Sequence, residues 1–455
     1  MESDLFLKHS IAELLAKYKS KELTPIDVAE GSLDTMRRLN EKYKAMVCYD
    51  DINLLRQARL LKLRLEGGKS PRPLEGMPLG VKDIFNTIDF PTQMGSPLWK
   101  EFTPGNDARS VFYVKEAGGL ISGKTGTAEF AVHTLGETLN PHNVSKSPGT
   151  SSSGSAVGIA LGMFPVSLGT QTAGSIVRPA SFCGIYGCKP SFGLIPRTGT
   201  LKTTDSLDTI GFFTAFCADL ERMFEVVRVK GPDYPISHAA LTDEKRQTRL
   251  AKRPWQVALA KTHTFKHAPS YAQGALLDFA QELDKNKEIE VHEVELPSVM
   301  KNAHDVHATI YNKTLSYYFK GEFERSELVS PIMNELITQG LKITSKQYQE
   351  ALIEQEIMIH QLDSFLINYD TMVSLSTAGE APPRHNRESP DPALMWTMTH
   401  LPVISVPAFI SPNGLPFGMQ IVSRKYNDYL LFKFIKYLRS KNIIPAATNP
   451  VLRLA

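Results

Sequence analysis

The spacing of apolar residues in the first third of the chain predicts helices. Apolar positions recur three and four residues apart, and each run follows a residue that caps helix N-termini well. Ser10 precedes IAELLAKYKSK, Thr24 stands before a proline suited to a first helical turn, and Asp50 precedes a run that ends at Gly67. We therefore expect helices over residues 1–70.

A different pattern follows, in which short continuous apolar runs flank one amphipathic segment. GMPLGVKDIF and GLISGKT are apolar runs of the kind that forms buried strands, and ARSVFYVKEAG between them is typical of a helix, which we expect Asp107 to cap. Strand, helix and strand in this order predict an α/β fold in which helices cover a sheet.

Gly, Ser and Thr become dense between residues 145 and 215. The stretch SPGTSSSGSA (147–156) has the composition of a flexible linker, but apolar runs such as AVGIALG, FPVSLG and CGIYGC surround it. A linker lacks such runs. We therefore expect a folded region in which Ser153 and Ser155 begin and cap a helix.

From residue 232 to 395 the chain is more charged and mostly helical in pattern. WQVALAK and IEVHEVELP are the predicted strands of this region. Two further strand patterns, PVISVPAF and GMQIVSR, come after it, and the amphipathic run YNDYLLFKFIKYLRSK predicts a final helix.

Composition narrows the classes of function. The 455 residues include 51 basic and 48 acidic side chains, and a net charge of +3 gives no reason to expect nucleic acid as a partner. Four cysteines are too few for a disulfide framework, so we interpret them as reduced core thiols. The chain shows no signal-peptide pattern at its start and no run of 18 apolar residues, which predicts a cytoplasmic protein that does not bind membranes.

Several familiar catalytic signatures are missing from the sequence. GTSSS fails the last position of Gly-x-Ser-x-Gly, no His-Glu-x-x-His occurs, and SVMK (298–301) fits Ser-x-x-Lys only as a pattern that arises often by chance. Three candidates remain, namely Lys82 beside an apolar run, Ser151 in GTSSSGS and Ser175 in GTQTAGSIVRPASFCG. Taken singly, each also has a plainer interpretation as a surface lysine, a solvated turn or a turn capped by its serine.

Taken together, these segments resemble the amidase signature family. GMPLGVKD matches the family's Gly-Val-x-Val-Lys-Asp segment, and GTSSSGSA matches its Gly-Gly-Ser-Ser-Gly-Gly-Ser-Ala run. QTAGSIVRPASFCG is similar to Asp-Thr-Gly-Gly-Ser-Ile-Arg-x-Pro followed by Cys-Gly, and the spacing of 24 between Ser151 and Ser175 also fits. HLPVISVPAFISPNGLPFGMQIVSR resembles the family's closing strands, so the resemblance covers most of the chain.

The resemblance implies a single large domain over 1–455, with a central mixed β-sheet covered on both sides by helices. Within it, residues 72–215 would form the signature core. Residues 232–395 would form a variable, mainly helical region that sets substrate specificity, and residues 396–455 would supply the closing strands and the C-terminal helix.

The resemblance also implies a catalytic triad without histidine. Ser175 would be the nucleophile, Ser151 would follow a cis peptide bond and relay protons, and Lys82 would be the neutral base. Ser152 would support the relay by hydrogen bonding. The oxyanion hole would consist of backbone N–H groups, those of Thr172, Ala173, Gly174 and Ser175. The implied reaction is hydrolysis of a carboxamide C–N bond through an acyl-enzyme, without metal or cofactor.

Three departures from the family pattern bear on this site. Gln171 replaces the usual Asp, Ala173 replaces a glycine and so requires a negative φ, and Arg178 stands three residues after Ser175 instead of two. The Gln-Thr-Ala-Gly-Ser variant resembles a subgroup of bacterial amidases and urea-derivative hydrolases. This implies a small aliphatic or aryl amide as substrate, or a urea-like amide such as biuret or carboxybiuret.

We expect substrate choice to depend on the segments that depart most from the family. Besides the helical region, these are TGTAEFAVH (125–133) and LSTAGEAPP (375–383). A lone histidine such as His133 also has a structural interpretation. The candidate pocket residues are Thr127, His133, Thr150, Ser376 and Thr377.

Two other functions fit the same residues. One is the amidase subunit of a tRNA-dependent amidotransferase, which works with a partner and delivers ammonia through a channel; QTAG in place of DTGG argues against it. The other is a binding protein or an inactive relative, against which the retention of Lys82, Ser151 and Ser175 argues. A small-molecule amide and water are the expected partners, and a homodimer is compatible with the sequence.

Overall fold

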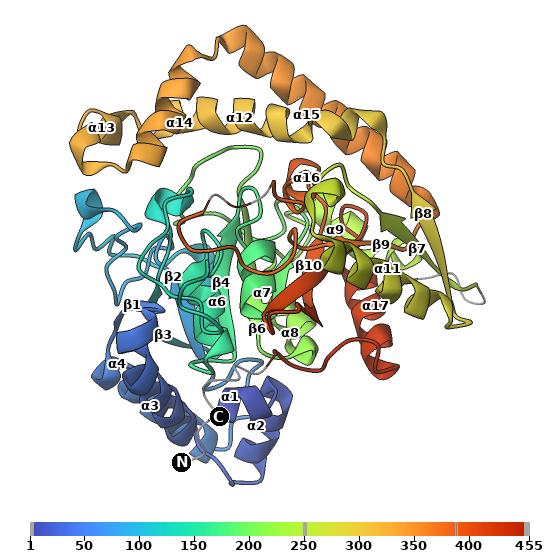
Figure 1. The fold of residues 1–455 in the computed structure, drawn as a ribbon. Helices are drawn as coiled ribbons and strands as arrows, with labels where there is room; N and C mark the ends of the chain where they lie inside the picture. Colours follow the sequence, from blue (N-terminus) through green and yellow to red (C-terminus); the bar gives the residue numbers. More distant parts are fainter. Residues whose placement is uncertain (1–3, 249–252, 387, 389, 450–455) are drawn as a thin grey trace.

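The N-terminal helices begin at the residues that the sequence predicts. The computed structural model describes residues 4–248, 253–386, 388 and 390–449 (Figure 1). Ser10 caps α2 (Ile11–Lys19) and Thr24 caps α3 (Pro25–Tyr43), each in a reciprocal capping box. Asp50 caps α4 (Asp51–Glu66) through the N–H of Asn53.

One mixed sheet of 11 strands runs through the described part of the chain, in the order β1-β3-β2-β4-β6-β5-β10-β11-β9-β7-β8. β2 pairs in parallel with β3 and β4, and β7 pairs in parallel with β8 and β9. The predicted α/β fold with a central mixed sheet is therefore confirmed. The strands are β1 (Met46–Tyr49), β2 (Pro78–Lys82), β3 (Leu120–Thr125), β4 (Val166–Gln171), β5 (Tyr186–Lys189), β6 (Thr209–Thr214), β7 (Trp255–Ala260), β8 (Ile289–Val294), β9 (Thr371–Leu375), β10 (Val403–Ile410) and β11 (Pro416–Val422).

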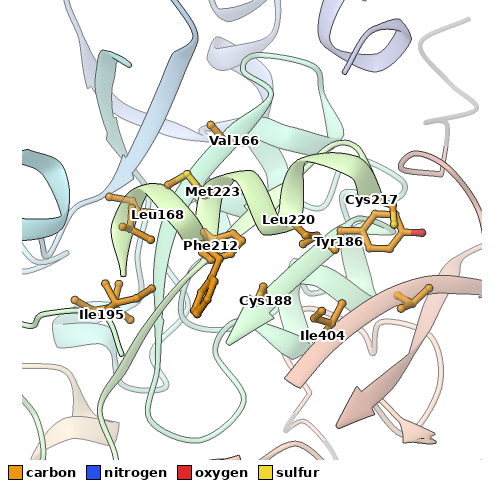
Figure 2. Packing of buried hydrophobic residues seen from close by; sticks show 14 of the residues in the cluster. Val166, Leu168, Tyr186, Cys188, Ile195, Phe212, Cys217, Leu220, Met223 and Ile404 are labelled. Atoms are coloured by element: carbon orange, nitrogen blue, oxygen red, sulfur yellow. The ribbon is translucent and has the colours of Figure 1, made fainter. Parts of the chain in front are cut away.

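Helices cover the two faces of the sheet, and the pleat of β6 shows how. Phe212 belongs to the apolar cluster that contains Leu220 and Met223 of α8, whereas its neighbour Phe213 belongs to the cluster of α6 and α7. Figure 2 shows α8 lying across the strands on the Phe212 side. The further helices that concern the site and its surroundings are α5 (Arg109–Glu116), α6 (Ser153–Ala160), α7 (Val177–Cys183), α8 (Leu220–Val227), α11 (Ser270–Asp284) and α17 (Asp428–Ser440).

The charged region before the closing strands forms a helical layer of its own. In Figure 1, α12, α14 and α15 lie along the top of the molecule, outside the sheet and the helices that cover it. A third apolar cluster joins α12 and α15 to the buried Trp396 of α16. The remaining helices are α1 (Leu5–Lys8), α9 (Pro235–Thr242), α10 (Glu244–Gln247), α12 (Ala303–Tyr318), α13 (Lys320–Phe323), α14 (Pro331–Lys342), α15 (Ser345–Phe365) and α16 (Leu394–Met398).

Two predicted caps are wrong, and three strands are not predicted from the sequence. Asp107 does not cap α5; its carboxylate accepts a hydrogen bond from the Lys115 ammonium instead. Ser153 begins α6 as predicted, but Ser155 lies inside that helix and its hydroxyl donates to the Leu168 carbonyl of β4. The strands β1, β6 and β9 are not predicted, because each adjoins a stronger helix or loop pattern.

The cysteines are free thiols, and Cys183, Cys188 and Cys217 are buried in the apolar clusters, as predicted. None of the helices in the described residues combines the length and the apolar character needed to span a membrane.

Candidate active site

Lys82 is the last residue of β2, and its side chain is fully buried. Its Nζ lies 2.7 Å from Ser151 Oγ and 2.9 Å from Thr170 Oγ1. Burial lowers the pKa of Lys82 well below the usual range of a lysine, and the negative charge of Asp208 opposes this only in part. Lys82 therefore favours the neutral amine. The nearby Lys124 differs, because it forms a buried ion pair with Asp83 at 3.1 Å.

The hydroxyl-rich loop lies against this lysine. The peptide bond between Thr150 and Ser151 is cis, as the resemblance implies, and Ser151 is fully buried. Ser152 Oγ donates to the Thr170 carbonyl at 3.2 Å and accepts from the Thr170 N–H at 3.3 Å. Ser152 thus holds the strand residue whose hydroxyl contacts Lys82, and does not bind Ser151 directly in the way that we expected.

Ser175 follows the turn 172–174 between β4 and α7, and only 7% of it is exposed. Ala173 does not have a positive φ, which satisfies the condition for an alanine at this position. Gln171 Oε1 accepts the N–H groups of Ile176 and Val177 at 2.8 and 2.9 Å. The amide oxygen of Gln171 thus satisfies two N–H groups at the start of α7 without a charge.

Each carbonyl of the turn 172–174 has a hydrogen-bond donor. In chain order the donors are His307 Nε2 at 2.9 Å, Thr397 Oγ1 at 2.6 Å and the Arg178 N–H at 2.8 Å. The backbone N–H groups of residues 173–175 have no hydrogen-bond partner among the described residues. Three consecutive donors therefore remain available to a ligand.

Arg178 of α7 forms a buried ionic cluster beside this turn. Its guanidinium binds Asp391 at 2.5 Å and Glu388, and it donates to Thr150 Oγ1 at 2.7 Å. Asp391 also lies against Gly174, where an added Cβ would be 1.7 Å from the carboxylate. Position 174 therefore accepts only glycine. The cluster joins the segment before α16 to both hydroxyl-bearing loops.

Two cavities border these residues. The smaller, of about 160 Å³, is lined by Thr170 and Thr172 together with Asp208. The larger, of about 350 Å³, is lined by Arg178 and Asp391 together with the loop 377–383. Thr170 contacts Lys82 and Arg178 contacts Thr150, whereas Lys82, Ser151 and Ser175 themselves are not among the lining residues of either cavity.

The candidate pocket residues do not all lie together. Thr377 lines the larger cavity, and Thr150 contacts Arg178. The other three lie outside the linings of both cavities. They are Thr127, which donates to the Ala128 carbonyl, Ser376, which bonds to Ser405, and His133, which is exposed with its ring 6.1 Å from that of Tyr311.

Other candidate chemistry does not gather into a site. Lys301 of the SVMK pattern is exposed. Within the residues that the structure describes, no three His, Cys, Asp or Glu side chains are grouped closely enough to hold a metal ion. The residues that sequence reasoning missed are Thr170, Asp208, His307, Thr397, Glu388 and Asp391. Thr170 and Asp208 lie in segments that resemble the family, and the other four carry no local signal.

This arrangement has the parts that acyl transfer requires. A buried amine with a lowered pKa lies within hydrogen-bond distance of a serine hydroxyl, and a second serine carries the last of three unengaged backbone N–H groups. An amine with a lowered pKa can act as a base, and such N–H groups can stabilise a developing oxyanion.

Comparison with known proteins shows which proteins the chain resembles. The chain is 34% identical over 264 residues to a glutamyl-tRNA(Gln) amidotransferase subunit from Heliobacterium modesticaldum, a match over 56% of this chain and about half, 53%, of that protein. It is 27% identical to the protein of the same name from a Sulfurihydrogenibium species, over 96% of this chain and 97% of that protein. The crystal structure of an amidase has the same fold, with a TM-score of 0.85 at 24% identity over 95% of this chain and 100% of that one.

The model of the amidase family matches residues 27–432, which is most of the chain. This extent, together with the motifs and the fold, establishes the family. The chain belongs to the amidase signature family, whose enzymes act on C–N bonds.

Proposed function

We propose that this protein hydrolyses a carboxamide through an acyl-enzyme formed on Ser175, with Lys82 and Ser151 as the proton relay. The observation that carries the proposal is the 2.7 Å separation between Lys82 Nζ and Ser151 Oγ in a site that favours the neutral amine. Serine needs a base to become a nucleophile, and no histidine or carboxylate is bonded to Ser151 among the described residues.

The relay first carries a proton from Ser175 toward Lys82 and then returns one to the leaving nitrogen. Lys82 accepts the proton of Ser151 while Ser151 accepts that of Ser175, and Ser175 Oγ attacks the carbonyl carbon. The proton then returns through Ser151 to the leaving nitrogen, so that ammonia or an amine departs as the C–N bond breaks. Water attacks the acyl-enzyme by the same relay and releases the carboxylic acid and free Ser175.

The oxyanion of each tetrahedral intermediate would lie against the turn before Ser175. The N–H groups of residues 173–175 are free of other partners among the described residues, which supports this assignment. One such donor is typically worth about 3 kcal/mol of transition-state stabilisation.

We propose a small aliphatic or aryl amide as the substrate, or a urea-like amide of the biuret or carboxybiuret type. The cavity of about 350 Å³ beside Arg178 supports a ligand of this size. A carboxylated substrate would compete with Glu388 and Asp391 for Arg178. A screen should therefore pair each uncharged amide with its carboxylated analogue.

The test is release of ammonia or amine from such a panel by the purified chain. We expect Ser175→Ala and Lys82→Ala each to lower kcat by at least about 10⁴-fold, and Ser151→Ala to keep a trace of activity. Ser167→Ala is the control, because this buried hydroxyl of β4 bonds to the Ser155 carbonyl. Turnover near that of the wild type in Ser175→Ala or Lys82→Ala would refute the mechanism.

A second candidate is the amidase subunit of a tRNA-dependent amidotransferase. The match along 97% of a glutamyl-tRNA(Gln) amidotransferase subunit favours it. The same assay separates the two functions, because a self-sufficient amidase needs no second subunit. If simple amides are inert and ammonia release from glutamine requires a partner protein, the amidotransferase function replaces the first.

A further inference from the structure

The turn before Ser175 is fixed by residues that lie more than 120 positions further along the chain. His307 comes from α12, and Thr397 comes from α16. Both donate to carbonyl oxygens of the turn, and both are buried. The geometry of the peptide group shows how these two residues orient the N–H groups of the turn. The argument rests on the proposed function of Ser175.

In a trans peptide the C=O and N–H bonds point in opposite directions. The carbonyls of Thr172 and Ala173 point toward α12 and α16, where their donors lie. The N–H groups of Ala173 and Gly174, which share those peptide planes, must therefore point away from these helices. A rotation of either plane would break a buried hydrogen bond, which costs about 1–3 kcal/mol when a buried group is left unsatisfied.

The bond at Ala173 depends on a chain of three groups with a fixed direction. Gln171 Nε2 donates to Thr397 Oγ1 at 3.0 Å, and Thr397 in turn donates to the Ala173 carbonyl at 2.6 Å. Gln171 can be a donor here because its other amide atom accepts the two N–H groups at the start of α7. A carboxylate at position 171 has no donor, and it would compete for the hydroxyl proton of Thr397.

The bond at Thr172 has a fixed direction as well. A carbonyl oxygen only accepts, so His307 Nε2 carries the proton and donates. Burial lowers the pKa of His307 to about 4, which keeps the ring neutral at physiological pH. The Thr172 hydroxyl is held in addition by Asp208 at 2.7 Å.

We infer that Gln171, Thr397 and His307 are positioning residues that keep the N–H groups of the turn aimed at the oxyanion. Their hydrogen bonds run to the turn, to the start of α7 and to one another, not to Lys82 or to the hydroxyls of Ser151 and Ser175. Gln171, which replaces the family's aspartate, therefore supports the oxyanion hole, because it allows Thr397 to donate to the Ala173 carbonyl.

The test uses a fluorophosphonate probe, whose phosphoryl oxygen occupies the oxyanion position during labelling of a nucleophilic serine. Thr397→Val removes the hydroxyl and keeps the shape, whereas Thr397→Ser keeps the hydroxyl. We expect Thr397→Val to lower the maximal labelling rate by at least about tenfold with little change in the half-saturating probe concentration. Thr397→Ser should stay within about threefold of the wild type, and both variants should melt within a few degrees of it.

Gln171→Glu extends the test with an isosteric change. It should slow labelling as much as Thr397→Val, and the double variant should be no slower than either single variant, because both act on one bond. His307→Gln, which can place an amide donor near the former Nε2, should label faster than His307→Phe.

The outcomes separate this inference from the proposed function. Labelling that persists in Ser175→Ala, or no labelling of the wild type, overturns the assignment of Ser175 and the inference with it. Labelling that is lost in Ser175→Ala but equally fast in Thr397→Val and Thr397→Ser overturns the inference alone.

Discussion

Three lysines are buried among the residues that the structure describes, and their hydrogen-bond partners differ. Lys124 forms an ion pair with Asp83, and Lys189 donates to the backbone carbonyls of Pro190 and Leu401. Lys82 meets two hydroxyl groups, which both donate and accept. At this scale the sequence identified Lys82 by its motif, but only the structure shows that its partners suit a group that exchanges protons.

The lowered pKa of Lys82 predicts a pH-dependent stability difference from Lys82→Met. Below the unfolded lysine pKa of about 10.4, the unfolded chain holds a proton that the folded chain releases, so folding gains stability as pH rises. We expect wild type to gain stability relative to Lys82→Met as pH rises from the lowered folded pKa toward the unfolded pKa, with a slope of at most about 1.4 kcal/mol per pH unit. Denaturant unfolding at several pH values measures this, and a constant difference would contradict the neutral lysine.

The anchors of the turn could not be found from the sequence. His307 lies in the variable region 232–395 and Thr397 just after it, and a single His or Thr on a helix has no distinctive pattern. Asp391 is similar, because its contact with Gly174 depends on how a loop returns to the site. Motifs therefore identified the residues proposed to react but not those that hold the turn.

At the scale of the elements, capping residues predicted where helices begin. These predictions failed where another group formed a hydrogen bond with the expected capping side chain. The capping boxes at Ser10 and Thr24 need only residues within one turn, and both form. Asp107 fails as a cap because its carboxylate binds Lys115. Ser155 fails because the sheet offers its hydroxyl the carbonyl of Leu168.

The N-terminus of α2 is also held by a residue that is distant in the chain, Asp219, and this contact predicts a pH dependence of stability. The fully buried carboxylate of Asp219 accepts the N–H of Ile11 at 3.2 Å, and burial raises the pKa of Asp219 to about 7. The folded chain therefore holds a proton between pH 4 and 7 that the unfolded chain releases, and stability falls as pH rises through this window.

Asp219→Asn keeps an acceptor for Ile11 and removes the ionisation. We expect its free energy of unfolding, relative to wild type, to increase by about 1.4 kcal/mol per pH unit within that window and to level off above pH 7. Asp219→Leu is the control, because it removes both the acceptor and the charge. If the free energies of unfolding of wild type and Asp219→Asn differ by the same amount at pH 5 and pH 8, the pKa of Asp219 is not raised. This slope is opposite in sign to that expected for Lys82.

At the scale of the molecule, chain order and spatial order differ. β10 lies between β5 and β11, so the closing strands join the first six strands to the β9-β7-β8 end of the sheet. The sequence predicted these strands individually, but their place in the middle came only from the resemblance and the structure. Pairing between strands that are distant in the chain produces no periodic pattern in the sequence of either strand.

This topology predicts that residues 1–395 are inactive although they contain Lys82, Ser151 and Ser175. Without residues 396–455 the sheet lacks the strands that join its two parts, and Ala173 lacks Thr397. We expect the fragment to show no labelling by the fluorophosphonate probe, and co-expression of 396–455 as a separate chain to restore part of it. Equal labelling of fragment and full chain would show that the site forms without the closing strands.

The central position of β10 has a further meaning for a chain made on a ribosome. All three residues proposed to react leave the exit tunnel long before the strand that holds their surroundings together. A growing chain thus carries the proposed nucleophile unassembled until β10 and β11 have emerged. Their emergence is in this sense the event that switches the proposed activity on.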